Sequence, residues 1–156
     1  MPKIQKTVMV DMDHVLCDFD KRWAEVKIEH PDLAYPQSLP GFFAELDPIE
    51  GGVESYKWLS ENFDTWILTR ASYKNQNCYT DKRLWVEKHL GIEVCPRLII
   101  CSEKGLLKGD YLVDDYPWPK FGGTQLKFGR YGEYKTWRAV TDYFKQKYLD
   151  ADICTG

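Results

Sequence analysis

The stretch MVDMDHVLCDFD, residues 9–20, is the most informative part of the sequence, because two aspartates, Asp11 and Asp13, stand where a short apolar run at residues 7–10 ends. An apolar run of this length predicts a buried β-strand. Side chains alternate between the two faces of a strand, so Asp11 and Asp13 point to the same side where the chain leaves the sheet. Two converging carboxylates repel each other unless a cation lies between them. The stretch therefore predicts a cation site at a strand end.

Short apolar runs recur along the rest of the chain and predict further strands at residues 64–68, 97–101, 111–113 and 124–128. Helical patterns separate most of them, at residues 52–62, 80–90 and 134–149. Leu84, Val86 and Leu90 are the apolar positions of the second of these helices, and Gly91 is its expected cap. This alternation predicts an α/β fold with a doubly wound parallel sheet in a single domain, residues 1–156.

An insertion interrupts the pattern between the first strand and its return helix, at about residues 20–48. The segment is helical in pattern at residues 21–28 and is then broken by Pro31, Pro36, Pro40 and Gly41. A segment this short cannot bury a core of its own. We therefore expect a small cap that lies over the mouth of the sheet.

The composition excludes several classes of function. A formal net charge of -3, with no stripe of lysine and arginine, argues against binding of polymeric nucleic acid. No apolar stretch approaches the roughly 18 residues of a membrane span, and the apolar run at the N-terminus is too short for a signal peptide. We expect a cytoplasmic protein whose partner is a small molecule.

Chemically useful side chains lie where the predicted strands end. The first strand ends in Asp11 and Asp13, the second in Thr69, and the fourth in Asp114 and Asp115; Lys104 follows the third. Each of these is a weak signal alone, since such residues also serve in turns and on surfaces. The carboxyl ends of parallel strands face one ligand crevice, so together they predict a site for a phosphate group and a cation.

The order DxDxV, Thr, Lys and DD resembles the four signature motifs of the haloacid dehalogenase (HAD) superfamily of phosphohydrolases. Within that superfamily the chain resembles the 5'(3')-deoxyribonucleotidases over residues 11–115. His14 departs from the pattern, because family members usually have glycine there, and the cap is shorter than the family's. The stretches that carry the likeness are DMDHVLCDF (11–19), PGFFAELDPIEGG (40–52), WVEKHLG (85–91), RLIICSEK (97–104) and GDYLVDD (109–115).

The resemblance implies a mechanism. Asp11 would be the nucleophile that forms an aspartyl-phosphate, and Asp13 the general acid and then the base. Thr69 and Lys104 would bind the phosphoryl group, and Lys104 would also keep the nucleophile ionised.

The same resemblance implies a metal cofactor. Mg²⁺ would be held by Asp11, the main-chain carbonyl of Asp13, and Asp115. Asp114 would support the site by accepting a hydrogen bond from a metal-bound water or from Lys104.

Aromatic and basic side chains are candidates for substrate binding. Phe19 and Phe43 are expected to contact the substrate, and Arg70 and Lys74 to pair with phosphate or ribose. Stacking of an aromatic side chain on a base contributes roughly 1–3 kcal/mol, although aromatic residues of a cap also serve to pack it against the body. The aromatic residues that flank the presumed mouth are Phe19, Trp23, Tyr35, Phe42 and Phe43.

These features predict a magnesium-dependent phosphomonoester hydrolase acting on (deoxy)nucleoside monophosphates. The short cap leaves open another small phosphate ester, either a sugar phosphate or a nucleic-acid 3' end. Two non-catalytic alternatives are a receiver-like signalling domain, whose motif order differs, and a nucleotide- or metal-binding remnant. A small cap also favours a homodimer in which a second subunit completes the pocket.

Overall fold

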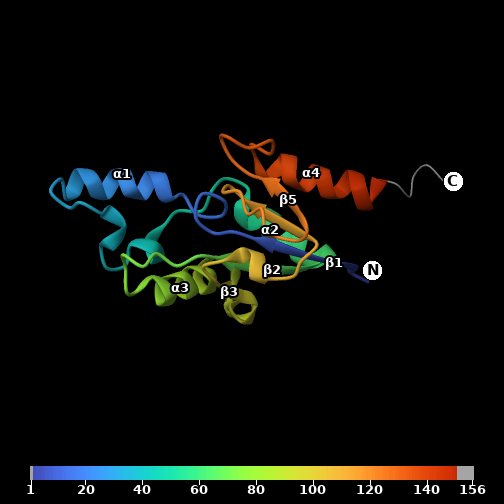
Figure 1. Cartoon of the computed structure of the whole chain (residues 1–156), viewed down its shortest axis with the longest axis horizontal. Coiled ribbons are helices and arrows are strands. Elements are labelled where there is room, and N and C mark those ends of the chain that lie inside the picture. Colours follow the sequence, from blue (N-terminus) through green and yellow to red (C-terminus); the bar gives the residue numbers. More distant parts are fainter. Residues whose placement is uncertain (1, 151–156) are drawn as a thin grey trace.

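The computed structural model describes residues 2–150 and contains one parallel sheet of five strands in the order β3-β2-β1-β4-β5 (Figure 1). The strand order reverses at β1, since β2 and β3 lie on one side of it and β4 and β5 on the other. This arrangement confirms the predicted α/β class and the doubly wound parallel sheet. The strands are β1 Ile4–Val10, β2 Phe63–Thr69, β3 Leu98–Ile100, β4 Tyr111–Asp114 and β5 Thr124–Lys127.

The two faces of the sheet are covered differently. Three helices, α2 (Gly52–Asn62), α3 (Cys78–Leu90) and α4 (Trp137–Tyr148), bury their apolar residues in one cluster together with Val8 and Val10 of β1. A second cluster on the other face contains Met9, Leu68, Leu112 and Phe121. Its cover comes from the connections on either side of β4, which include one short 3-10 helix, η4 (Lys104–Leu106).

The predicted elements agree with the structure in most places. Helix α2 has the predicted bounds, and Gly91 caps α3 with a φ of 109°. Strand β1 begins three residues earlier than expected, at Ile4. The apolar face assigned to α3 was wrong at Leu84, which is 47% exposed. The buried face of α3 contains Cys78, Asp81, Lys82, Trp85, Val86 and Leu90.

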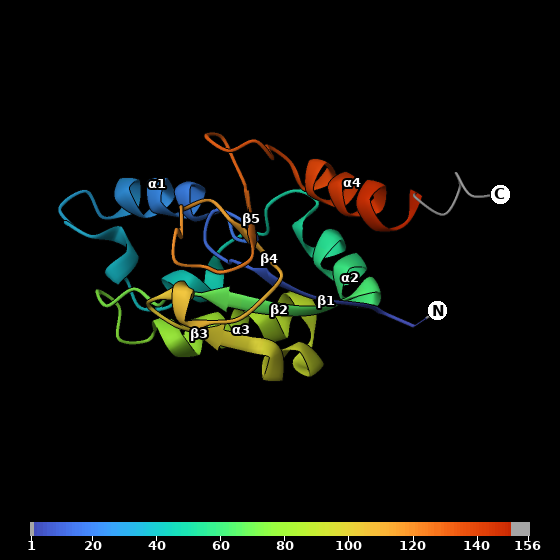
Figure 2. The same ribbon diagram turned by 45° about the vertical axis from the view of Figure 1, so that its right-hand side comes forward.

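The insertion after β1 forms helix α1 (Phe19–Glu29) and two 3-10 helices, η1 (Pro36–Ser38) and η2 (Phe42–Glu45). Figures 1 and 2 show this segment at the end of the molecule opposite to the start of β1 and the end of α4. Phe42, Phe43 and Leu46 join the main apolar cluster, so the segment shares the core of the body. The indole Nε1 of Trp85 donates to Leu46 O at 2.8 Å and fastens the end of the insertion to α3.

Loop residue Asn75 holds the insertion from the side of β2. Its Nδ2 donates to the carbonyls of Gln37 and Leu39, at 3.0 and 3.1 Å. The side chain is 4% exposed, so these bonds form in a largely water-free place where each unpaired partner would be costly.

Among residues 2–150, no helix has the length and apolar character that a membrane crossing requires.

Trp137 ties the last helix to the loop that carries Asp13. The indole is 1% exposed, and its Nε1 donates to Val15 O at 2.8 Å. Trp137→Phe removes the donor and leaves a small gap, so we expect the free energy of unfolding to fall by about 2 kcal/mol. Denaturant titration measures this. Trp23→Phe, at a side chain 38% exposed, is the control and is expected to change stability by less than about 0.5 kcal/mol. Equal stability of the two variants would contradict the assigned role of Trp137.

Candidate active site

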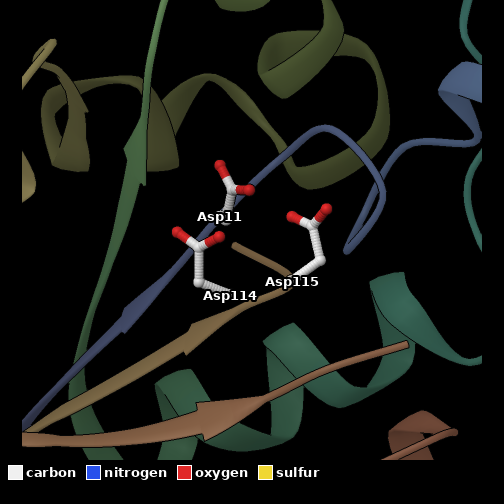
Figure 3. A group of neighbouring side chains, drawn as sticks. All are labelled: Asp11, Asp114 and Asp115. Atoms are coloured by element: carbon white, nitrogen blue, oxygen red, sulfur yellow. The ribbon is translucent and has the colours of Figure 1, made fainter. Parts of the chain in front are cut away.

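Three carboxylates converge where β1 and β4 end (Figure 3). Asp11 follows the last residue of β1, Asp114 is the last residue of β4, and Asp115 comes next. The backbone N–H of Asp11 donates to Val113 O at 3.0 Å, so the carboxyl ends of β1 and β4 lie side by side. One oxygen from each carboxylate lies within 4.8 Å of the other two. The acids thus meet at the point where the strand order reverses, the usual place for a ligand crevice in such sheets.

Lys104 lies among these acids. Its Nζ is 2.9 Å from Asp11 Oδ1 and donates to Asp114 Oδ2 at 2.5 Å. The side chain is 2% exposed, and it is held at the start of η4, where Glu103 Oε1 accepts from the backbone N–H of Gly105 at 2.9 Å. The structure therefore brings Lys104 to the nucleophile candidate and shows a direct hydrogen bond from Lys104 to Asp114.

The cluster has an excess of negative charge. Burial first, and the nearby Asp11 carboxylate second, raise the pKa of Asp114 to about 8 and that of Asp115 to about 7. When all three acids are ionised, the single positive charge of Lys104 leaves two negative charges unbalanced. A divalent cation would balance them. The available donors are all carboxylate oxygens, and such hard donors suit Mg²⁺. Asp11, Asp114 and Asp115 could therefore hold this ion.

A second buried lysine, Lys82 of α3, contacts Asp13 and Thr69. Its Nζ donates to Asp13 Oδ2 at 3.0 Å and to Thr69 Oγ1 at 2.8 Å. Burial alone would lower the pKa of this ammonium, but nearby anions, Asp13 first among them, raise it above its ordinary value. Asp13 is thus held by a different cation from Asp11, and its carboxylate lies outside the group formed by the other three acids.

Sequence reasoning missed Lys82, although a signal was present. Cys78, Trp85 and Val86 are buried at helical spacing and place Lys82 on the same face of α3. A lysine is almost never fully buried unless it is paired, so a lysine on the apolar face of a helix should have been read as a partner for an acid. The choice of Leu84 as a core position hid this pattern.

A cavity of about 650 Å³ opens above the cluster. Its lining contains every predicted site residue except Thr69, whose side chain is fully buried. Thr69 is therefore linked to the site by Lys82, whose Nζ donates both to Thr69 Oγ1 and to Asp13 Oδ2. The predicted residues that line the cavity are Asp11, Asp13, Phe19, Phe43, Arg70, Lys74, Lys104, Asp114 and Asp115.

The aromatic candidates divide between the cavity and other places. Phe19 and Phe43 line the cavity, whereas Phe42 is fully buried in the core. Trp23 and Tyr35 do not belong to the lining; Tyr35 instead packs under the Lys74 ammonium, 3.5 Å from its ring centroid. The expectation that all five flank the mouth was therefore too broad.

Trp118 also lines the cavity and was not predicted. Its ring centroid lies 5.5 Å from Lys104 Nζ and 6.0 Å from Arg70 Cζ, so the indole joins two cations of the site. Its position in the sequence DDYPWP, three residues after the acidic pair, was the available signal.

His14 has an unusual backbone for a residue with a side chain. Its φ is 65°, and among residues 2–150 it is the one non-glycine residue with a positive φ. The left-handed conformation costs such a residue about 1–2 kcal/mol. The turn is held by hydrogen bonds from His14 N to Cys17 O at 2.9 Å and from Cys17 N to Met12 O at 2.9 Å. The strain expected from the His-for-Gly exchange is thus present and is accommodated.

Comparison with known proteins places this site in a family. Residues 32–130 match the family described as 5' nucleotidase, deoxy (pyrimidine), cytosolic type C protein. A protein of Vibrio phage KVP40 that carries the provisional name 5'(3')-deoxyribonucleotidase is 35% identical, over 87% of this chain and 82% of the phage protein. The chain belongs to this nucleotidase family. Membership confirms the resemblance drawn from the motifs and is inconsistent with the receiver-like alternative.

Two further comparisons place the nucleotidase among known proteins. The human protein named 5'(3')-deoxyribonucleotidase, cytosolic type, is 33% identical, with 69% of each chain covered. The class C acid phosphatase from Bacillus anthracis superposes with a TM-score of 0.55 at 16% identity, over 94% of this nucleotidase and 64% of the phosphatase chain. This second likeness shows a shared fold.

The raised pKa values of Asp114 and Asp115 predict how the stability of the nucleotidase depends on pH. Both acids bind a proton more tightly in the folded chain than in the unfolded chain, where the pKa is near 3.8. In EDTA the free energy of unfolding should therefore fall as pH rises above about 4, and this loss should be complete above about pH 8. Thermal unfolding at pH 5.5 and pH 8 measures the effect.

Added MgCl₂ should raise the unfolding temperature more at pH 8 than at pH 5.5, because the ion binds the ionised acids of the folded state. Asp115→Asn removes one of the two titrating groups, so this variant should show a flatter pH profile in EDTA and a smaller response to magnesium. A response to magnesium that is the same at both pH values would contradict the assignment of these acids as ligands.

Proposed function

We propose that the protein hydrolyses (deoxy)nucleoside monophosphates with Mg²⁺ and through an aspartyl-phosphate on Asp11. Membership of the nucleotidase family makes the protein a phosphoric monoester hydrolase of the 5'-nucleotidase type. The observation that carries the finer proposal is the cluster of Asp11, Asp114 and Asp115 around Lys104, which lies at the wall of a cavity large enough for a nucleotide.

Hydrolysis needs a nucleophile and a proton donor that act in sequence. Asp11 attacks phosphorus, the bond from phosphorus to the ester oxygen breaks, and Asp13 gives its proton to that oxygen. Asp13 then takes a proton from the water that attacks the aspartyl-phosphate, which releases phosphate and restores Asp11. Different lysines hold the two acids, Lys104 for Asp11 and Lys82 for Asp13, so each carboxylate has a cation of its own.

Positive charge must offset the charge of the phosphoryl oxygens during both steps. A magnesium ion held by Asp11, the Asp13 carbonyl and Asp115, with Asp114 in support, would supply much of it. Lys104 keeps Asp11 ionised, and Lys82 adds a second fixed cation between Thr69 and Asp13. Thr69 acts by orienting Lys82, while the backbone N–H groups that follow it are candidates to bind the phosphoryl oxygens.

The walls of the cavity suit a nucleoside as the leaving group. Phe19 and Phe43 offer aromatic faces to a base, and Arg70 and Lys74 offer positive charge to the rest of the substrate. The homodimer and the cytoplasmic location expected from the sequence stay predictions.

Asp11→Asn should abolish turnover while leaving the fold intact, because an amide of equal volume replaces the attacking oxygen. Phosphate release from a panel of deoxynucleoside monophosphates, sugar phosphates and a 3'-phosphorylated oligonucleotide measures this. We expect turnover of the mononucleotides in magnesium, none in EDTA, and a loss of at least about 1,000-fold in the variant.

Asp142→Asn is the matched control, since Asp142 lies on the exposed surface of α4 far along the chain from the site. It should retain full activity. Turnover that survives both chelation and Asp11→Asn would refute the mechanism, and preference for the oligonucleotide or a sugar phosphate would replace the proposed substrate class.

Lys82→Met tests the second cation. Methionine keeps the length and apolar stem of the side chain but leaves Asp13 and Thr69 without their shared donor. We expect kcat/KM for a nucleotide to fall by about 100-fold, because a preorganised charge of the site is lost. Lys88→Met, on the exposed face of the same helix, is the control and should have no effect on kcat/KM. Circular dichroism of both variants checks the fold. Native activity in a folded Lys82→Met variant would show that Lys82 serves packing alone.

A further inference from the structure

The side chain of His14 occupies a place in the cavity that the backbone does not favour. The residue has a φ of 65°, a conformation that glycine adopts freely and that residues with a Cβ adopt rarely. Its ring nevertheless lines the cavity, beside Asp13. Strain of this kind persists where the surrounding structure holds it, and such positions cluster at functional sites.

The ring of His14 has neighbours on two sides. The ring centroid lies 4.9 Å from that of Phe19, with the two planes tilted by 44°. On the other side, Nδ1 is 3.6 Å from Asp20 Oδ1, at the first turn of α1. Because Asp20 lies against Nδ1, the other ring nitrogen, Nε2, is the one that can meet a ligand. His14 and Phe19 thus form one continuous aromatic wall with a single polar atom available.

The position of this wall relative to the acids indicates which part of a substrate it meets. The phosphoryl group must lie against Asp11 and Lys104, where the charges of the site gather. Asp13 faces the ester oxygen if it protonates the leaving group, and His14 follows Asp13 directly in the chain. A side chain at this place in the lining therefore lies next to the part of the cavity that the leaving group would occupy.

We propose that His14 is a specificity-determining residue that, with Phe19, recognises the base of a nucleoside monophosphate by ring contact and one hydrogen bond at Nε2. This inference rests on the proposed function and deepens it. A heteroaromatic base has the flat face and polar edge that such a wall fits, whereas a sugar phosphate has neither. The histidine side chain therefore sets the preference of the enzyme for a nucleotide over the same phosphate ester without its base.

The test compares two esters that share sugar and phosphate, thymidine 5'-monophosphate and 2-deoxyribose 5-phosphate. His14→Gly and His14→Asn both tolerate the left-handed backbone, so neither variant is expected to unfold. We expect each to lower kcat/KM for the nucleotide by about tenfold, mainly through KM, as loss of one stacking contact implies. The effect on 2-deoxyribose 5-phosphate should be far smaller. His30→Ala, which removes an exposed histidine outside the cavity, is the matched control.

Binding gives a second readout that does not depend on turnover. In the Asp11→Asn background, isothermal titration with thymidine 5'-monophosphate should show about tenfold weaker binding when His14 is also replaced by Gly. Equal losses for both esters, or no loss in either assay, would overturn the assignment of His14 while leaving the proposed function standing. Absence of turnover by the unmodified protein on every ester would contradict the proposed function and this inference with it.

Discussion

Asp11, Asp114 and Asp115 lie close enough to repel one another, and the groups around them are arranged to offset that repulsion. Three carboxylates in a largely buried place are unfavourable unless positive charge is brought to them. The parallel pairing of β1 with β4, in which Met9 lies beside Leu112 and Val10 beside Val113, forces the acids together at the strand ends. Lys104 supplies one positive charge from the neighbouring connection, and a divalent cation would balance the negative charge that remains when all three acids are ionised.

A second lysine gives Asp13 a partner separate from that of Asp11. Lys82 reaches Asp13 from a helix on one face of the sheet, while Lys104 reaches Asp11 from the connection between β3 and β4. Each of these two carboxylates thus has a lysine of its own, although they are only two residues apart in the chain. Separate partners place the two acids in different surroundings, and each ammonium favours the ionised form of the acid that it holds.

The parts of the site that the sequence revealed are those that follow directly from strand geometry. Thr69 and Asp114 are the last residues of β2 and β4, Asp11 directly follows β1, and the carboxyl ends of parallel strands lie at the same edge of the sheet. Lys82 and Trp118 were not predicted. The place of Lys82 depends on which face of α3 is buried, and that of Trp118 on how the irregular connection after β4 folds. Leu84 was the more apolar choice for the core of α3, but the need to pair Asp13 and Thr69 placed Lys82 inside and left Leu84 exposed. Local hydrophobicity carries no information about a partner that is distant in sequence.

The short insertion after β1 has a consequence for selectivity. Phe42, Phe43 and Leu46 belong to the same apolar cluster as the sheet, and Asn75 and Trp85 bind the segment to the body through buried hydrogen bonds. Moving it as a separate lid would open the core and break those bonds, so the wall of the cavity keeps a fixed shape. Discrimination between substrates must then come from the side chains that line this wall. Backbone strain at His14, one of these lining residues, persists because hydrogen bonds between residues 12 and 17 hold the turn.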